Sequence, residues 1–176
     1  MRALVVFESM FGNTLRIARA VAEGLAPYAD AEVAEVGAAP AQPGADVDLV
    51  VVGGPTHAFG MSRERTRADA GKQAGGPLVS RGVGVREWLS SLPASSGVSA
   101  AVFDTRVNIR GFPGSAGRAV ARRLRSAGYH LIAAPESFYV ESTRGPLADG
   151  ELDRARRFGD ALGRTLRSYA HASPQS

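Results

Sequence analysis

The fold of this chain is decided by residues 3–14, which read Ala-Leu-Val-Val-Phe-Glu-Ser-Met-Phe-Gly-Asn-Thr. The first five residues form a continuous apolar run, which is typical of a parallel strand buried on both faces. The polar residues and the glycine that follow are typical of a turn into a helix. That helix is indicated by apolar or small residues at the spacing of one buried face, at Ile17, Ala20, Val21, Gly24 and Leu25.

Similar units continue along the chain. Further strands are predicted at 32–36, 47–53 and 98–103, and a last strand covers 129–133 and 137–140 with an interruption at Pro135. Helical spacing recurs in three segments, at 85–92, 117–124 and 155–166. Strands that alternate with helices predict an α/β fold, a doubly wound five-stranded parallel sheet with helices on both faces.

The 176 residues are expected to form one domain over 1–169, followed by a flexible tail over 170–176. Met61 to Gly84 is Gly-rich and basic and lacks clear periodicity, so we predict a long functional or disordered loop there.

Composition excludes several classes of protein. No apolar run reaches the ~20 residues of a membrane span, and the N-terminus reads as a strand rather than a signal peptide, so we expect a cytoplasmic protein. The absence of cysteine excludes disulfides, thiolate metal sites and a cysteine nucleophile. The three histidines lack a metal-binding spacing, which argues against zinc.

The basic charge is uneven. Residues 61–130 hold twelve Lys or Arg against four acidic residues, in a chain of net charge +4. This segment indicates either a surface that attracts acidic partners or phosphates, or a general preference for arginine in the composition. No nucleic-acid-binding motif accompanies the charge, so nucleic acid is not expected as a partner.

The loop after the first strand is the first candidate site. It offers two hydroxyls, a glycine that allows close backbone approach, and the free N–H groups of a helix start, which together suit an anion. The alternative is a capped helix, with Ser9 or Asn13 as the cap. Neither a phosphate-binding Gly-x-x-x-x-Gly-Lys loop nor a dinucleotide fingerprint is present. The candidate residues are Ser9, Met10, Phe11, Gly12, Asn13 and Thr14.

This loop carries a family resemblance. Ser9-x-x-Gly12-Asn13-Thr14 resembles the phosphate loop of flavodoxins, although Phe11 stands where flavodoxins usually have a hydroxyl residue. Ser9-Met10-Phe11-Gly12 is also similar to the Ser-Met-Tyr-Gly of flavodoxin-fold NAD(P)H:quinone oxidoreductases. The resemblance implies a flavodoxin-like fold with strand order 2-1-3-4-5, and FMN as the cofactor.

The second candidate loop follows the strand at 47–53. Phe59-Gly60 is similar to the Trp-Gly of flavodoxins, which implies an aromatic ring beside the flavin, while Phe59 packed onto the core is the alternative. Pro55-Thr56 is similar to the Pro-Thr of the quinone oxidoreductases, and His57 is a candidate proton donor or substrate contact.

The third candidate loop follows the strand at 98–103. By position it resembles the flavodoxin loop that holds the pyrimidine edge of the flavin, with Phe112 for stacking and Thr105 and Asn108 for hydrogen bonds. Asp104 and Arg106 complete the predicted set. Flavodoxins are acidic at this edge, whereas this chain has Arg106 and Arg110, which are predicted either to stabilise the reduced flavin or to face solvent.

The favoured function is electron transfer by a flavodoxin-like protein with bound FMN, which exchanges electrons with a redox partner protein. The first alternative is an NAD(P)H-dependent quinone or small-molecule reductase of the same fold. The second is a signalling or interaction module without a cofactor.

Overall fold

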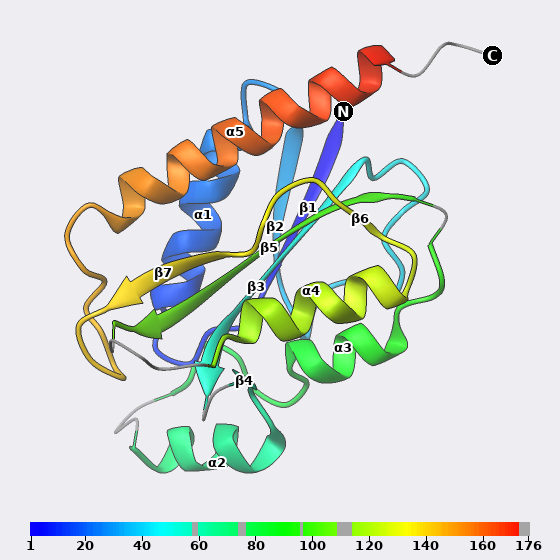
Figure 1. Ribbon diagram of the computed structural model, residues 1–176. Coiled ribbons are helices and arrows are strands. Elements are labelled where there is room, and N and C mark those ends of the chain that lie inside the picture. Colours follow the sequence, from blue (N-terminus) through cyan, green and yellow to red (C-terminus); the bar gives the residue numbers. More distant parts are fainter. Residues whose placement is uncertain (58–59, 74–76, 96, 109–113, 173–176) are drawn as a thin grey trace.

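The structure is a computed structural model that describes residues 1–57, 60–73, 77–95, 97–108 and 114–172 (Figure 1). Strands and helices alternate over most of the chain. In chain order they are β1 (Arg2–Phe7), α1 (Asn13–Leu25), β2 (Asp30–Glu35), β3 (Leu49–His57), β4 (Gly60–Met61), α2 (Glu64–Gln73), α3 (Val85–Ser91), β5 (Ser99–Val107), α4 (Ala116–Ser126), β6 (His130–Leu131), β7 (Glu136–Val140) and α5 (Glu151–Ala172).

The sheet has the predicted α/β arrangement, with small differences. Its order is β2-β1-β3-β5-β6, and these strands pair in parallel. The predicted last strand is divided into β6 and β7, which pair with different parts of β5, opposite Ser99 and Phe103 respectively. The two-residue β4 was not predicted, and it pairs antiparallel with the end of β3. Over the described residues the sheet therefore has seven strands instead of the predicted five.

Two helical layers cover the sheet. Helices α1 and α5 lie on one face, and α3 and α4 lie on the other (Figure 1). Because side chains alternate along a strand, Val51 joins the core under α1 and α5, whereas Val50 and Val52 join the core with Trp88.

Glycines allow α1 and α5 to approach closely. A Cβ atom on Gly24 would lie 2.1 Å from the carbonyl oxygen of Arg156, and one on Gly159 would lie 2.1 Å from that of Val21. Any larger residue would force the two helices apart, so this spacing keeps α5 over the helix that begins at the first candidate loop.

The predicted long loop at 61–84 is partly wrong, because it contains α2 (Figure 1). Burial is described for nine residues of this helix, 64–72, and of these only Arg67 and Ala70 are buried, so no apolar stripe marks it in the sequence. Polar contacts hold it instead. Arg67 Nη1 donates to Ser62 Oγ at 3.0 Å and pairs with Glu87 Oε2 at 3.2 Å.

Two strands and one helix are longer than predicted. β3 runs on to His57 and β5 to Val107, so several residues that we expected in loops lie on strands. α5 extends to Ala172, three residues into the expected tail, while residues 173–176 lie outside the described part. None of the helices in the described ranges has the length and apolar content needed to cross a bilayer.

Candidate functional site

A cavity opens at the carboxyl ends of β1, β3 and β5, where ligands bind in doubly wound sheets. Its volume is about 240 Å³. All three predicted loops contribute to it. Its lining comprises Ser9, Met10, Phe11, Asn13, Thr14, Pro55, Thr56, His57, Thr105, Arg106, Val107, Val140 and Thr143.

The loop between β1 and α1 has its own internal support. Gly12 is the N-cap of α1 with φ of 88°, a conformation that favours glycine. Its N–H donates to Ser9 Oγ at 3.1 Å, and the N–H of Ser9 donates to Ser80 Oγ at 2.9 Å. Neither of the predicted capping side chains caps the helix, because Asn13 lies inside it and donates to the carbonyl oxygen of Arg144 at 3.1 Å.

The same loop presents backbone donors that have no acceptor. Within the described part of the chain, no hydrogen bond is made by the N–H groups of Met10, Phe11, Asn13 or Thr14. The first N–H groups of a helix point out of its N-terminal end, and these residues line the cavity. Together with the helix dipole they favour an anion at this position.

Two hydroxyls from distant parts of the chain meet in the cavity wall. Thr14 Oγ1 on α1 and Thr105 Oγ1 on β5 lie 2.7 Å apart, and both residues are buried. Either hydroxyl can donate its hydrogen to the other or accept from it, so the pair can reorient to donate towards a ligand.

Asp104 lies beneath this wall and outside the cavity lining. It is fully buried, and its Oδ2 accepts from Thr56 Oγ1 at 3.1 Å, Ser115 Oγ at 2.6 Å and the N–H of Gly117 at 2.9 Å. Thr56 Oγ1 also accepts from the N–H of Ala116 at 3.0 Å. Asp104 therefore fixes the start of α4 to the ends of β3 and β5, and it orients Thr56, which does line the cavity.

Two titratable or charged residues, His57 and Arg106, line the cavity, and the buried Glu8 lies directly before its first loop. Burial, helped by the charge of Arg67, lowers the pKa of His57 below its ordinary value, so this cavity-lining imidazole is neutral at pH 7. Burial raises the pKa of Glu8, whose Oε2 accepts from the N–H of Val85 at 2.8 Å. Arg106 lines the cavity, and its guanidinium group is held by a hydrogen bond to the carbonyl oxygen of Gly114 at 2.9 Å.

The remaining predicted residues have other positions. Asn108 is exposed and does not line the cavity, and Gly60 on β4 lines a separate groove. Phe59, Arg110 and Phe112 lie outside the described residues.

The segment after β7 contributes residues that the sequence analysis missed. Thr143 lines the cavity, and the guanidinium carbon of Arg144 lies 5.8 Å from the centroid of the Phe11 ring. A signal for this segment existed, because it follows the last parallel strand and therefore lies at the same edge of the sheet as the other three loops.

No protein-family model matches the chain, and no curated protein sequence matches it. Solved structures do. A flavodoxin from the domain Archaea is 19% identical with a TM-score of 0.66, over 95% of this chain and 99% of that protein. Oxidised flavodoxin 1 from Bacillus cereus is 18% identical with a TM-score of 0.66, over 96% and 99%. This chain has a flavodoxin-like fold.

Two other similar structures differ from each other in the size of the whole protein. A WrbA-like flavodoxin from Agrobacterium tumefaciens is 20% identical with a TM-score of 0.59, over 95% of this chain and 98% of that one. Rubredoxin oxygen:oxidoreductase from Desulfovibrio gigas is 15% identical with a TM-score of 0.65, over 96% of this chain, which spans 37% of that protein. The flavodoxin-like unit is therefore found both alone and inside larger redox proteins.

Proposed function

We propose that this chain binds FMN at the cavity and transfers electrons as a flavodoxin-like carrier. The observation that carries the proposal is the set of unpaired N–H groups at the start of α1, next to the buried hydroxyls of Thr14 and Thr105. A phosphate dianion needs several donors in a small space, and helix N-termini supply them without a lysine. The donors present fit the phosphate of FMN.

The volume of the cavity indicates which part of FMN fits inside it. Its volume of about 240 Å³ is below the roughly 300–1,000 Å³ of pockets that enclose whole ligands. We therefore assign the phosphate and its ribityl chain to the cavity and the flat ring to the rim. Pro55, His57 and Arg106 border that rim from β3 and β5.

FMN, when bound, supplies the redox chemistry, and the residues of the chain hold and tune it. The free N–H groups of Met10, Phe11, Asn13 and Thr14 would hold the phosphate. Arg106 places a positive charge at the rim, which favours the more negative, reduced form of a flavin. Neutral His57 offers one N–H donor to an atom of the ring or of a substrate.

Reconstitution tests the proposal. The purified chain is titrated with FMN and, separately, with FAD, while flavin fluorescence and visible absorbance are followed. We expect binding of FMN with a visible flavin spectrum. FAD is not expected, because we find one anion site at the cavity and no dinucleotide-binding motif in the sequence. Preference for FAD in mass analysis of heat-released cofactor, or no uptake of excess FMN, would refute the proposal.

One observation favours a second candidate, an NAD(P)H-dependent reductase. His57 is a neutral hydrogen-bond donor in the lining, and Ser9-Met10-Phe11-Gly12 and Pro55-Thr56 are similar to the quinone oxidoreductase motifs. Oxidation of NADPH by the FMN-loaded protein with only a quinone added would favour the reductase. Electron transfer only through a second protein would favour the carrier.

A further inference from the structure

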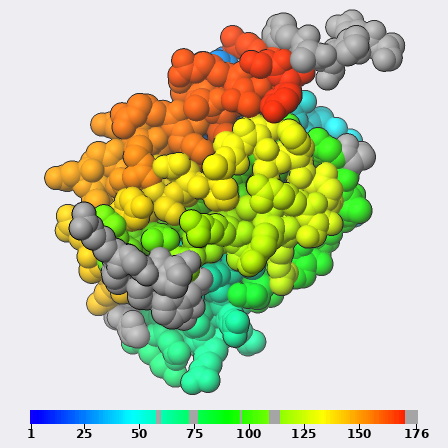
Figure 2. Space-filling model, in the orientation of Figure 1, coloured from blue at the N-terminus to red at the C-terminus, as the bar shows by residue number. Residues whose placement is uncertain are grey.

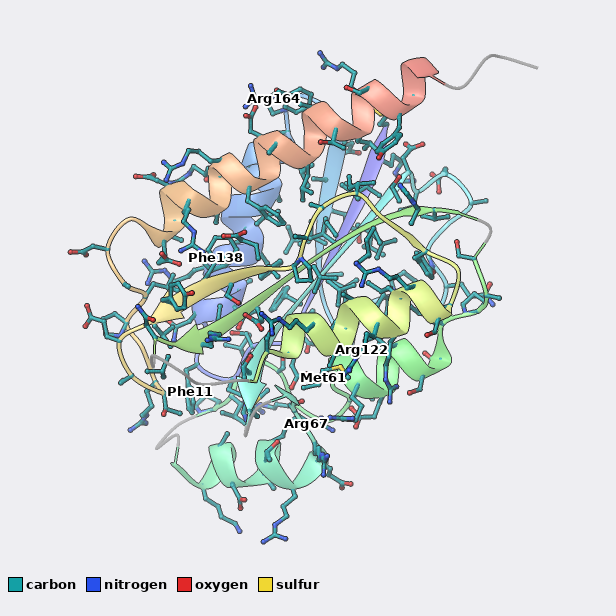
Figure 3. All side chains as sticks on the ribbon, in the orientation of Figure 1. Phe11, Met61, Arg67, Arg122, Phe138 and Arg164 are labelled. Carbon is teal, nitrogen blue, oxygen red and sulfur yellow. The ribbon has the colours of Figure 1, made fainter. Side chains whose placement is uncertain are left out.

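A groove of about 820 Å³ lies beside the cavity, along α4 and the start of α3. Figure 2 shows this face, with α4 in yellow-green near its centre, and Figure 3 labels Arg122 there. Five arginines line the groove, and no acidic residue is among the described lining residues. The arginines are Arg86, Arg118, Arg122, Arg123 and Arg125.

These charges are poorly offset by acidic residues in the described part of the chain, where the charge of Glu87 acts on Arg86. Across the described ranges, none of the five arginines forms an ion pair. Arg86 donates to the carbonyl oxygens of Met61 and Ser62, both at 3.1 Å, and Arg123 donates to Ser90 Oγ at 2.6 Å. Burial and the neighbouring charges of Arg63 and Arg123 lower the pKa of Arg86 from its ordinary value. The repulsion among these cations is relieved by an anionic partner.

The groove ends at the candidate flavin site. Gly114 and Ser115 line the groove, while Thr56 and Arg106 line the cavity. The two sets are joined by the hydrogen bond from Arg106 Nη1 to the carbonyl oxygen of Gly114 at 2.9 Å. In addition, Ala116, which follows Ser115, donates its N–H to Thr56 Oγ1 at 3.0 Å. A partner in the groove therefore lies next to the rim of the cavity.

We propose that this groove docks the acidic surface of a protein that exchanges electrons with the bound flavin. The electron exchange in this proposal rests on the proposed function, because it requires bound FMN. Each exchange moves one electron from the reduced protein to the oxidised one, and no atom is transferred.

The distribution of the arginines favours a protein over other anions. Arg118, Arg122 and Arg125 are exposed on one helix and span about 10 Å along it, at roughly 1.5 Å per residue. They do not converge on one point as the ligands of a single phosphate do. The large exposed apolar side chains of the described chain are Met1, Val79, Val83 and Tyr169, none of which lines the groove, so a lipid surface finds nothing to bury there. No aromatic residue is among its described lining, which disfavours base stacking.

The test uses the FMN-loaded full chain and an acidic two-iron ferredoxin as the probe. Arg118→Glu with Arg122→Glu reverses two exposed charges of the groove. The control, Arg19→Glu with Arg157→Glu, makes the same change in net charge at two exposed arginines of α1 and α5, on the other face of the sheet. Kd for the ferredoxin and the rate of electron transfer from its reduced form are measured over a range of salt concentrations.

We expect the groove pair to weaken ferredoxin binding by about tenfold or more at low salt, and the control pair by less than about twofold. Electron transfer should slow in parallel, while FMN affinity is unchanged. Equal losses in both variants would overturn the proposal, since net charge alone would then explain binding. So would no binding of ferredoxin, or tighter binding of a short DNA duplex or of phosphatidylserine vesicles through the same residues.

The proposed function fails separately. If the chain takes up no FMN but the unloaded protein still binds ferredoxin through Arg118 and Arg122, the docking surface stands and the flavin chemistry does not.

Discussion

Substitutions of Asp104 test whether this residue stabilises the fold or contacts the cofactor directly. Its Oδ2 accepts three hydrogen bonds, from Thr56, Ser115 and Gly117, at the start of α4. Asp104→Ala leaves these donors without their acceptor and removes a negative charge from a helix N-terminus. At roughly 1.5–3 kcal/mol for each hydrogen bond to a charged group, less the cost of burying that charge, we expect a loss of about 3–5 kcal/mol in the free energy of unfolding.

Asp104→Asn is the matched control, because it keeps the shape and one acceptor oxygen. We expect it to cost about 1–2 kcal/mol, mainly through the lost charge. Urea unfolding followed by circular dichroism measures both values. A loss below about 1 kcal/mol for the alanine variant would refute the structural role.

The asparagine variant also tests contact with the cofactor. Asp104 lies outside the cavity lining, so FMN affinity should fall by less than about threefold, or roughly 0.6 kcal/mol. If stability is retained but FMN affinity falls more than tenfold, Asp104 binds the cofactor directly, as the sequence analysis predicts.

Three further predictions concern residues of the cavity lining and Glu8, which follows β1. Ser9→Ala with Thr14→Ala should weaken FMN binding by roughly 1.5–3 kcal/mol per lost hydroxyl in a fluorescence titration; unchanged affinity would place the phosphate elsewhere. Burial raises the pKa of Glu8 above the value of 4.5 that we take for the unfolded chain. The protonated side chain therefore stabilises the fold fully below about pH 4.5, and this stabilisation is lost as the pH rises through the pKa of the folded state. Glu8→Gln should remove that decline, which urea unfolding at pH 4 and pH 7 would reveal, and an unaltered pH dependence would contradict it. Arg106→Gln should make the midpoint potential of bound FMN more negative, by on the order of 20 mV for about 1 kcal/mol of lost charge stabilisation over two electrons; a spectroelectrochemical titration that shows no shift would mean that Arg106 is screened by solvent.

The fold was predictable because its signals are local and repeated. The apolar run at 3–7 and the helical spacing from Ile17 to Leu25 each report burial directly, and β1 and α1 follow them. The three predicted loops meet because the carboxyl ends of parallel strands lie at one edge of a sheet.

What the sequence could not predict depends on polar contacts between distant residues. α2 is held by Arg67, whose partners Ser62 and Glu87 lie outside the helix. No periodic apolar pattern in the sequence therefore predicts this helix. The sequence predicts Asp104 at the cofactor because its loop resembles, by position, the flavodoxin loop that holds the flavin. Only the three-dimensional structure shows that its three donors come from β3, from the N-cap of α4 and from α4 itself.

Arg106 and the arginine groove along α4 both attract negative charge. Arg106 at the rim favours a reduced, negatively charged flavin, and the groove along α4 favours a negatively charged partner. The segment at the start of α4 connects them. Arg106 donates to the carbonyl oxygen of Gly114, just before the helix, and Gly117 in the helix donates to Asp104. We therefore expect the proposed carrier to differ from acidic flavodoxins in both potential and partner. Reversing charge in the groove should alter the partner far more than the potential, whereas Arg106→Gln should do the opposite, since charges at exposed positions are screened within about 8–10 Å.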